Sequence, residues 1–279
     1  MVTHTKKRGF MKRAVMYTFI IWCTVMLLTD CKKDSGNNTA DEVPPNLAIV
    51  KSKINSTFHD MDTALARGVT TVEGAGVVEP VIRQVLTSYI DEFTCLMDCG
   101  YITSRGILQY IEPVQFRSSE GADISQQTHI IKIQQTHKPV LSSSFYAVEG
   151  FWSVTYAHPI LQDTSFLGSL FLLVKPQLFL KVIIVPYIQG TNEDYWVMEK
   201  GGRIIYDADS LEIGLNLFQD SLYASSPQLV TAGHTIDSQD DGRTTYQIYD
   251  TGTRNCISRE AFWTTINIYG TEWKLVYAR

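Results

Sequence analysis

The stretch SSSFYAVEGFWSVTYAHPILQDTSFLGSLFLLVKP, residues 142–176, decides the fold. Two runs inside it, residues 151–160 and 165–174, are rich in aromatic, β-branched and other apolar residues, as strands are. The short polar segment 162–164 separates them, which predicts an antiparallel hairpin. Alternation along the first run places four side chains on one face: Trp152, Val154, Tyr156 and His158.

That face joins an indole N–H, a phenol and an imidazole to apolar carbon, a mixture found in the walls of small-molecule pockets. The same side chains also occur in ordinary cores, where Tyr and Trp bury with one hydrogen bond. The sequence therefore leaves two interpretations of this face, a ligand-contacting wall and a packed core.

Outward from the hairpin, hydrophobic periodicity and turn residues define the other elements of the first half. The sequence predicts helices at residues 46–67, 79–91 and 125–135, and strands at 94–99, 105–111 and 139–143. Gly68 is expected to end the first helix, and Gly100 to form the turn between the first two strands.

The pattern restarts after a connecting helix that begins at Pro176, a favoured first helical residue. The predicted elements are strands at 195–199 and 203–206, a helix at 225–232, and strands at 244–249, 259–268 and 272–278. The second half thus repeats the order of the first. We expect an α+β fold in which a long N-terminal helix is followed by two antiparallel-sheet modules.

Composition and charge limit the functions that the chain can have. Apolar residues make up 44% and charged residues 19%, as in a globular protein with a core. The net charge is -5, and without residues 1–31 it is -9, from 19 basic and 28 acidic residues. Residues 32–279 are therefore acidic and lack the clustered Lys and Arg that nucleic-acid binding requires. We expect no nucleic-acid partner.

Residues 1–31 are identified as an export leader. A basic pair precedes fifteen uncharged residues, 14–28, which is short for a membrane span but typical of a signal sequence. Cys31 and the polar linker of residues 32–45 follow, an order that resembles a lipoprotein signal with Cys31 as the lipidated residue. Because Asp30 stands where that pattern has Gly, Ala or Ser, an uncleaved N-terminal anchor is the alternative. Either form of anchor places the rest of the chain outside the cytoplasm. The chain is then held at the outer face of the cytoplasmic membrane, at the cell surface or in the periplasm.

Motifs of catalysis are missing from the sequence. It contains no GxSxG, no HExxH and no P-loop, so we expect neither an enzyme nor a bound cofactor. The spacing of His129, His137 and His158 matches no known metal motif, so no metal site is expected.

The segment YWVMEKGGRIIYDADSLEIGLNLF, residues 195–218, resembles the proximal half of Cache domains, which are extracytoplasmic relatives of PAS domains. Residues 121–143, together with GFWSVTYAHPI and LGSLFLLVKP, resemble the distal half of a double Cache module. The resemblance implies two PAS-like modules and a small-molecule pocket in the distal one. It also implies these divisions: N-terminal helices at 46–93, a distal module at 94–175, a connecting helix at 176–189 and a proximal module at 190–279.

Ligands of this family include amino acids, carboxylates, amines and purines. Its amino-acid-binding pattern has an Arg shortly before a Trp-Tyr pair on the distal helix. At the matching place this chain has Gln126, Gln127, His129 and Lys132, so the resemblance does not extend to amino-acid binding and the ligand class stays open. Family members usually continue into an output domain. This chain ends at Arg279, so we expect it to act through a membrane transducer protein, with a standalone binding protein as the alternative.

We place the candidate ligand site between the distal helix and the sheet. His129 and Lys132 lie three residues apart on one helical face and are donors for an anionic group. Both are also ordinary solvated helix residues in the alternative interpretation. The remaining candidates are two hydroxyl-bearing residues and the wall described above: Ser143, Tyr146, Trp152, Tyr156 and His158. Asp207 and Asp209 of the proximal turn motif are expected to cap the following loop, with ligand contact as the alternative.

The sequence thus predicts a membrane-tethered extracytoplasmic sensor module that binds a small molecule and has no output domain of its own. The apolar stripe of its long helix is expected to pack on its own domain, with pairing into a homodimer as the alternative. The alternatives are a non-catalytic structural or interaction lipoprotein that binds a membrane partner and no small ligand, and a receptor fragment that has lost its ligand. An open distal pocket favours the sensor, and a pocket filled by side chains favours the interaction protein.

Overall fold

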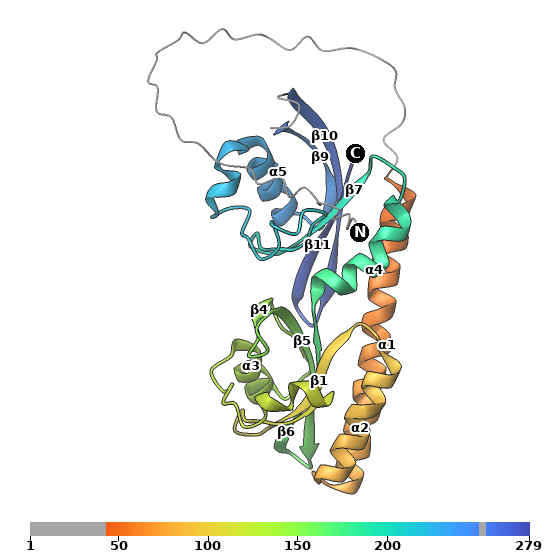
Figure 1. Ribbon diagram of the computed structural model, residues 1–279, viewed down its shortest axis with the longest axis vertical. Helices are drawn as coiled ribbons and strands as arrows, with labels where there is room; N and C mark the ends of the chain where they lie inside the picture. Colours follow the sequence, from red (N-terminus) through yellow and green to blue (C-terminus); the bar gives the residue numbers. More distant parts are fainter. Residues whose placement is uncertain (1–42, 251–254) are drawn as a thin grey trace, which may run out of the picture. The chain divides into compact units, whose positions relative to one another are not determined.

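The computed structural model describes residues 43–250 and 255–279 (Figure 1). The predicted leader, with its lipidation site Cys31, and all but the end of the linker at 32–45 lie outside the described residues and stay predictions. Within them the fold is α+β, with a long N-terminal helix and two antiparallel sheets, which confirms the predicted fold class.

Helix α1 (Pro45–Ala75) runs along both sheets (Figure 1). Its apolar residues recur at steps of three and four and form one buried stripe. Phe58, near the middle of that stripe, contacts both halves of the molecule. Its ring centroid lies 5.9 Å from that of Tyr156 in the first sheet and 5.4 Å from that of Trp273 in the second. The hydrophobic effect therefore fixes both sheets to one helix.

The prediction that Gly68 ends this helix is wrong, since α1 continues to Ala75. Gly68 is buried where α1 crosses helix α2 (Glu79–Glu92). A Cβ atom at Gly68 would lie 1.8 Å from the hydroxyl oxygen of Tyr89. The glycine is therefore explained by close helix packing and not by helix termination.

The first sheet has the order β2-β1-β6-β5-β3, with β4 paired to β5. Its strands are β1 (Leu96–Thr103), β2 (Leu108–Glu112), β3 (Val140–Leu141), β4 (Phe145–Tyr146), β5 (Trp152–Gln162) and β6 (Ser165–Val174). The hairpin of β5 and β6 confirms the central prediction. The turn predicted at Gly100 is wrong, because this glycine lies inside β1, where a Cβ would meet the ring of Phe171 at 2.5 Å.

Helices α1 and α2 cover one face of the first sheet, and helix α3 (Thr128–Thr136) with the 3-10 helix η1 (Val114–Ser119) lies on the other side (Figure 1). Under α3 lies a separate apolar cluster, whose members include Ile102, Ile130, Ala157 and Phe171. Helix α4 (Pro176–Ile188) leads into the second half and packs on α1, with the rings of Phe58 and Phe179 5.2 Å apart.

The second sheet has the order β8-β7-β11-β10-β9. Its strands are β7 (Asp194–Glu199), β8 (Ile204–Tyr206), β9 (Asp241–Asp250), β10 (Asn255–Ile268) and β11 (Thr271–Ala278). Helix α5 (Pro227–Ser238) and the 3-10 helix η2 (Ser221–Ser225) pack on this sheet, while its other face contributes to the core along α1. The two halves therefore share a strand–helix–strand plan, as the repeated sequence pattern predicts.

One carboxylate on α1 joins both sheets through hydrogen bonds. Asp62 Oδ1 lies 2.7 Å from each of three partners, the Tyr156 hydroxyl, His158 Nε2 and the Tyr269 hydroxyl. Tyr156 and His158 belong to β5, and Tyr269 lies in the turn between β10 and β11. Partial burial alone would raise the pKa of Asp62, but the bonds from Tyr269, Tyr156 and His158 outweigh it and lower that pKa.

Gly68→Ala should destabilise the fold, although alanine is normally the better helix former by about 1 kcal/mol. The new methyl group collides with the Tyr89 hydroxyl and with Val85, and overpacking of this kind costs about 1–3 kcal/mol. Urea denaturation measures the loss. Gly74→Ala, also in α1 but with nothing within 4 Å of a Cβ, is the matched control and should not destabilise. Equal effects of the two substitutions would contradict the packing role of Gly68.

Asp62→Asn should lower the free energy of unfolding by about 1–2 kcal/mol at pH 7, since bonds to a charged acceptor are lost from a partly exposed site. Because the folded-state pKa of Asp62 is lowered, its contribution is present above the unfolded pKa of about 3.9 and is lost as pH falls through the folded value. Asp60→Asn, on the exposed side of the same helix, is the control. A stability difference that persists unchanged at pH 3 would refute the assignment.

Candidate functional site

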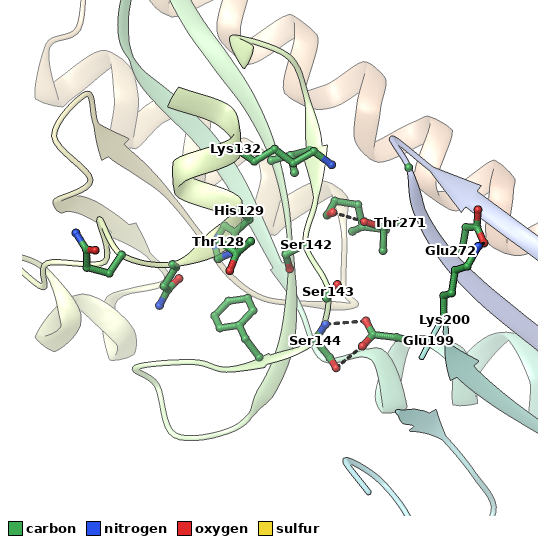
Figure 2. A pocket seen from close by; sticks show the side chains of 16 residues that line it. Thr128, His129, Lys132, Ser142, Ser143, Ser144, Glu199, Lys200, Thr271 and Glu272 are labelled. Atoms are coloured by element: carbon green, nitrogen blue, oxygen red, sulfur yellow. Dashed lines mark hydrogen bonds and ion pairs between the residues drawn. The ribbon is translucent and has the colours of Figure 1, made fainter. Parts of the chain in front are cut away.

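A cavity of about 600 Å³ lies beside the first turn of α3, between the two sheets (Figure 2). We call it the junction cavity. Residues from both sheets line it: Gln126, Gln127, Thr128, His129, Lys132, Val140, Leu141, Ser142, Ser143, Ser144, Phe145, Glu199, Lys200, Gly270, Thr271 and Glu272. Its volume is typical of small-molecule sites.

Hydrogen bonds tie the two sides of the junction cavity together. The backbone N–H of Ser144 donates to Glu199 Oε1 at 2.6 Å, and its hydroxyl donates to Glu199 Oε2 at 2.7 Å (Figure 2). Nearby, the Thr271 hydroxyl donates to the Leu141 carbonyl at 2.5 Å. The end of β3 is therefore held by the start of β11, and the segment that follows β3 is held by the end of β7.

The charged side chains of the junction cavity differ in whether a group of opposite charge compensates them. Burial raises the pKa of Glu199 above its ordinary value. The Lys200 ammonium donates to Glu272 Oε2 at 2.9 Å, so these two charges compensate each other. The Lys132 ammonium reaches only the Tyr269 carbonyl, at 3.3 Å, among the described residues. Lys132 is therefore the positive group best placed to receive an anion.

His129 lies at the inner end of the junction cavity and is 6% exposed. Its ring packs on Phe145 with the centroids 4.8 Å apart. Burial lowers the pKa of His129 to about 4, so the imidazole is neutral at neutral pH. The prediction of two charged donors, His129 and Lys132, is corrected in this respect: His129 supplies a neutral ring, and Lys132 the charge.

The other predicted site residues lie at the junction cavity, at a second cavity, or on the side of the first sheet that α1 covers. Ser143 lines the junction cavity. Tyr146 and Trp152 instead line a second cavity of about 280 Å³, which we call the Trp152 cavity, and their ring centroids lie 6.0 Å apart. The Arg203 guanidinium lies 4.8 Å from the centroid of the Trp152 ring. Ser144 lines both cavities, so they adjoin.

Tyr156 and His158 lie at neither cavity. They point to the side of the first sheet that α1 covers, where both bind Asp62. The alternation along β5 is as predicted, but the residues on the α3 side are the others, among them Thr155 and Ala157. The prediction that Tyr156 and His158 wall a pocket under α3 is therefore corrected: they join the sheet to α1.

The space directly between α3 and the first sheet is filled. Only about 20 Å³ remains there, scarcely more than one water molecule occupies. Phe145, Phe171 and Leu173 are among the side chains that take up the room. The predicted pocket location is therefore corrected: the ligand-sized space lies at the end of α3, toward the second sheet.

Sequence reasoning missed the side of the junction cavity that the second sheet supplies. Glu199, Lys200, Thr271 and Glu272 come from the second half of the chain, more than fifty residues after Ser144. Nothing in their local sequence marks them, since they stand at ordinary strand ends and turns. Only the pairing of the two sheets with one helix brings them to Ser144.

Within residues 43–250 and 255–279, no three His, Cys, Asp or Glu side chains are placed to hold a metal ion together. None of the helices described there combines the length and the apolar character of a membrane span.

Comparisons with known proteins identify the fold. The family model "HK/GC/Chemotaxis protein-like, sensor domain" matches residues 56–176, and it describes a sensor domain and not a catalytic one. No curated protein sequence matches the chain. A similar solved structure is the extracellular ligand binding receptor from Desulfohalobium retbaense DSM5692, with 28% identity, a TM-score of 0.71 and 83% of this chain covered. The chain spans only 39% of that receptor's length.

Two chemoreceptor structures share the fold at lower identity. The ligand binding domain of PctC from Pseudomonas aeruginosa PAO1, in complex with GABA, is 12% identical with a TM-score of 0.61, over 84% of this chain and 96% of that one. The domain of CtaA from Pseudomonas fluorescens, in complex with L-isoleucine, is 11% identical with a TM-score of 0.59, over 83% and 87%. The resemblance to Cache-type domains is confirmed: the chain has the fold of an extracellular ligand-binding sensor domain.

Burial of neutral His129 should make the fold sensitive to acid. Because its folded-state pKa is lowered to about 4, the unfolded chain binds a proton below pH 6.5 that the folded chain does not. Between pH 7 and pH 5 this group should lower the free energy of unfolding by about 2 kcal/mol. Urea denaturation of the chain and of His129→Gln at both pH values measures it. The variant should lose that part of the pH dependence, whereas exposed His59→Gln should keep it. Parallel pH profiles for all three would contradict the burial of a neutral ring.

Proposed function

We propose that this chain is the ligand-binding part of an extracytoplasmic sensor and that it binds a small molecule with an anionic group in the junction cavity. The observation that carries the proposal is a cavity of about 600 Å³ with residues of both sheets in its wall. A ligand there contacts both halves of the chain. Its binding free energy therefore depends on the relative position of the two sheets. That dependence is what a sensor requires, since a ligand shifts only those states that it binds with different affinity.

The anionic group follows from the charges of the cavity. Lys200 is compensated by Glu272, and Glu199 is held by Ser144, which leaves Lys132 as the cation for an incoming carboxylate or similar group. Ser143 and Thr128 add hydroxyl groups beside it. GABA, the ligand of PctC, carries a carboxylate and is a reasonable first probe.

The setting of the sensor remains a proposal from the sequence. The leader at residues 1–31 exports the chain, and Cys31 or the uncleaved leader anchors it to the outer face of the cytoplasmic membrane. Related sensor domains belong to chemotaxis proteins and kinases, so a membrane transducer protein is the proposed partner. A homodimer would have to use another surface, because the apolar stripe of α1 is buried against the chain's own two sheets.

A second candidate function rests on the filled interior under α3. If no small ligand enters, the module is a non-catalytic interaction lipoprotein that binds a membrane partner protein. The remaining space of about 20 Å³ at the place first predicted for the ligand favours this alternative.

A ligand screen separates the two functions. Thermal unfolding of the chain is followed with carboxylates including GABA, amino acids, purines, amines and sugars. A ligand at 100 times its dissociation constant should stabilise the fold by about 2.7 kcal/mol. We expect a carboxylate to give this shift, and Lys132→Gln to weaken its binding at least tenfold, because the charged donor is lost.

Lys138→Gln is the matched control, an exposed lysine just beyond the other end of α3. Binding that survives in Lys132→Gln would place the ligand elsewhere. Absence of any shift across the panel would favour the interaction protein, and capture of a membrane partner by the chain would then be the next measurement.

A further inference from the structure

A third cavity, of about 430 Å³, lies in the second module and shares no residue with the junction cavity. It lies between the second sheet and the segment that carries η2 and the start of α5. We call it the second-module cavity. Its size is within the range of small-molecule sites.

Three aromatic side chains stand in its wall among aliphatic ones. Trp196 from β7, Tyr246 from β9 and Tyr223 from η2 all line it and are 6%, 6% and 4% exposed. The Tyr223 hydroxyl donates to Glu212 Oε2 at 2.9 Å. Packing of the three buried rings and this hydrogen bond therefore fix part of the wall, as in a preformed site.

The cavity carries an excess of negative charge. Among the residues that the structure describes, four carboxylates line it, those of Asp194, Asp207, Asp209 and Glu212, and one cation, Arg259. Within the described part of the chain, none of the four makes an ion pair. Arg259 acts on Asp194 only over a longer distance, and its guanidinium donates to a backbone carbonyl.

Asp194, Asp207 and Glu212 are held in an environment that disfavours their charge. Burial, and then the neighbouring carboxylates, raise the pKa of Asp207 to about 7. Burial likewise raises the pKa of Asp194 and of Glu212. Backbone N–H groups satisfy one oxygen each of Asp194, Asp207 and Asp209. The loop caps expected from the sequence are thus present, but they leave the charge of the cavity uncompensated.

We propose that the second-module cavity is a second binding site, for an organic ammonium ion. The carboxylates compensate the positive head of such a ligand, and the faces of Trp196, Tyr223 and Tyr246 attract a cation as well as burying its carbon atoms. A ligand-sized space with aromatic walls suits an organic cation better than a bare metal ion. This site is separate from the proposed anion site. The chain would then carry one cavity for an anionic ligand and one for a cationic ligand.

Titration calorimetry with choline and with putrescine tests the proposal, and 3,3-dimethyl-1-butanol, the neutral isostere of choline, tests the need for charge. We expect one of the two cations to bind and the isostere not to bind. Asp207→Asn and Glu212→Gln keep the shape of the cavity and should each weaken cation binding at least tenfold. The two variants are made separately, and circular dichroism establishes which of them is folded.

Two controls complete the design. Asp163→Asn removes a carboxylate from the exposed turn between β5 and β6 and should leave binding unchanged. Lys132→Gln should also leave it unchanged, which separates this site from the junction cavity. The proposal is overturned if neither cation binds, if the neutral isostere binds equally well, or if the folded variants of Asp207 and Glu212 bind like the original chain.

Discussion

Burial of one apolar stripe on α1 against both sheets is the constraint on which the rest of this structure depends. Each sheet exposes an apolar face that must be covered, and one helix of 31 residues covers part of both. Phe58 contacts an aromatic ring in each sheet, and Asp62, one turn along, binds donors from each. Packing of the stripe stabilises the folded state. The hydrogen bonds of the Asp62 carboxylate fix the position of α1 along the two sheets.

Elements that depend on local pattern could be predicted from the sequence. The β5–β6 hairpin, the helix stripe and the repeated order of the two halves all follow from periodicity and turn residues. Gly68 and Gly100 were misassigned because a glycine that makes room for Tyr89 or Phe171 looks the same in sequence as one that ends a helix or forms a turn. Their roles depend on partners that are distant in the chain.

The candidate site was predictable only on the side that one module supplies. Alternation along β5 placed Tyr156 and His158 on one face, as the structure does, but periodicity cannot say which face of a sheet meets which helix. The opposite wall, with Glu199 and Thr271, comes from the other module and carries no local signal. His129 was assigned a charge that its burial removes. Each of these errors has the same origin. The residue type was known, but its neighbours in the folded chain were not.

Ser144 lines both the junction cavity and the Trp152 cavity while it holds Glu199. A molecule in either cavity that displaces this serine alters the wall of the other. Thermodynamic linkage then requires reciprocity: whatever factor one occupant imposes on the affinity of the other cavity, the second occupant imposes on the first. A single serine thus belongs to the walls of two cavities, and its position connects their shapes.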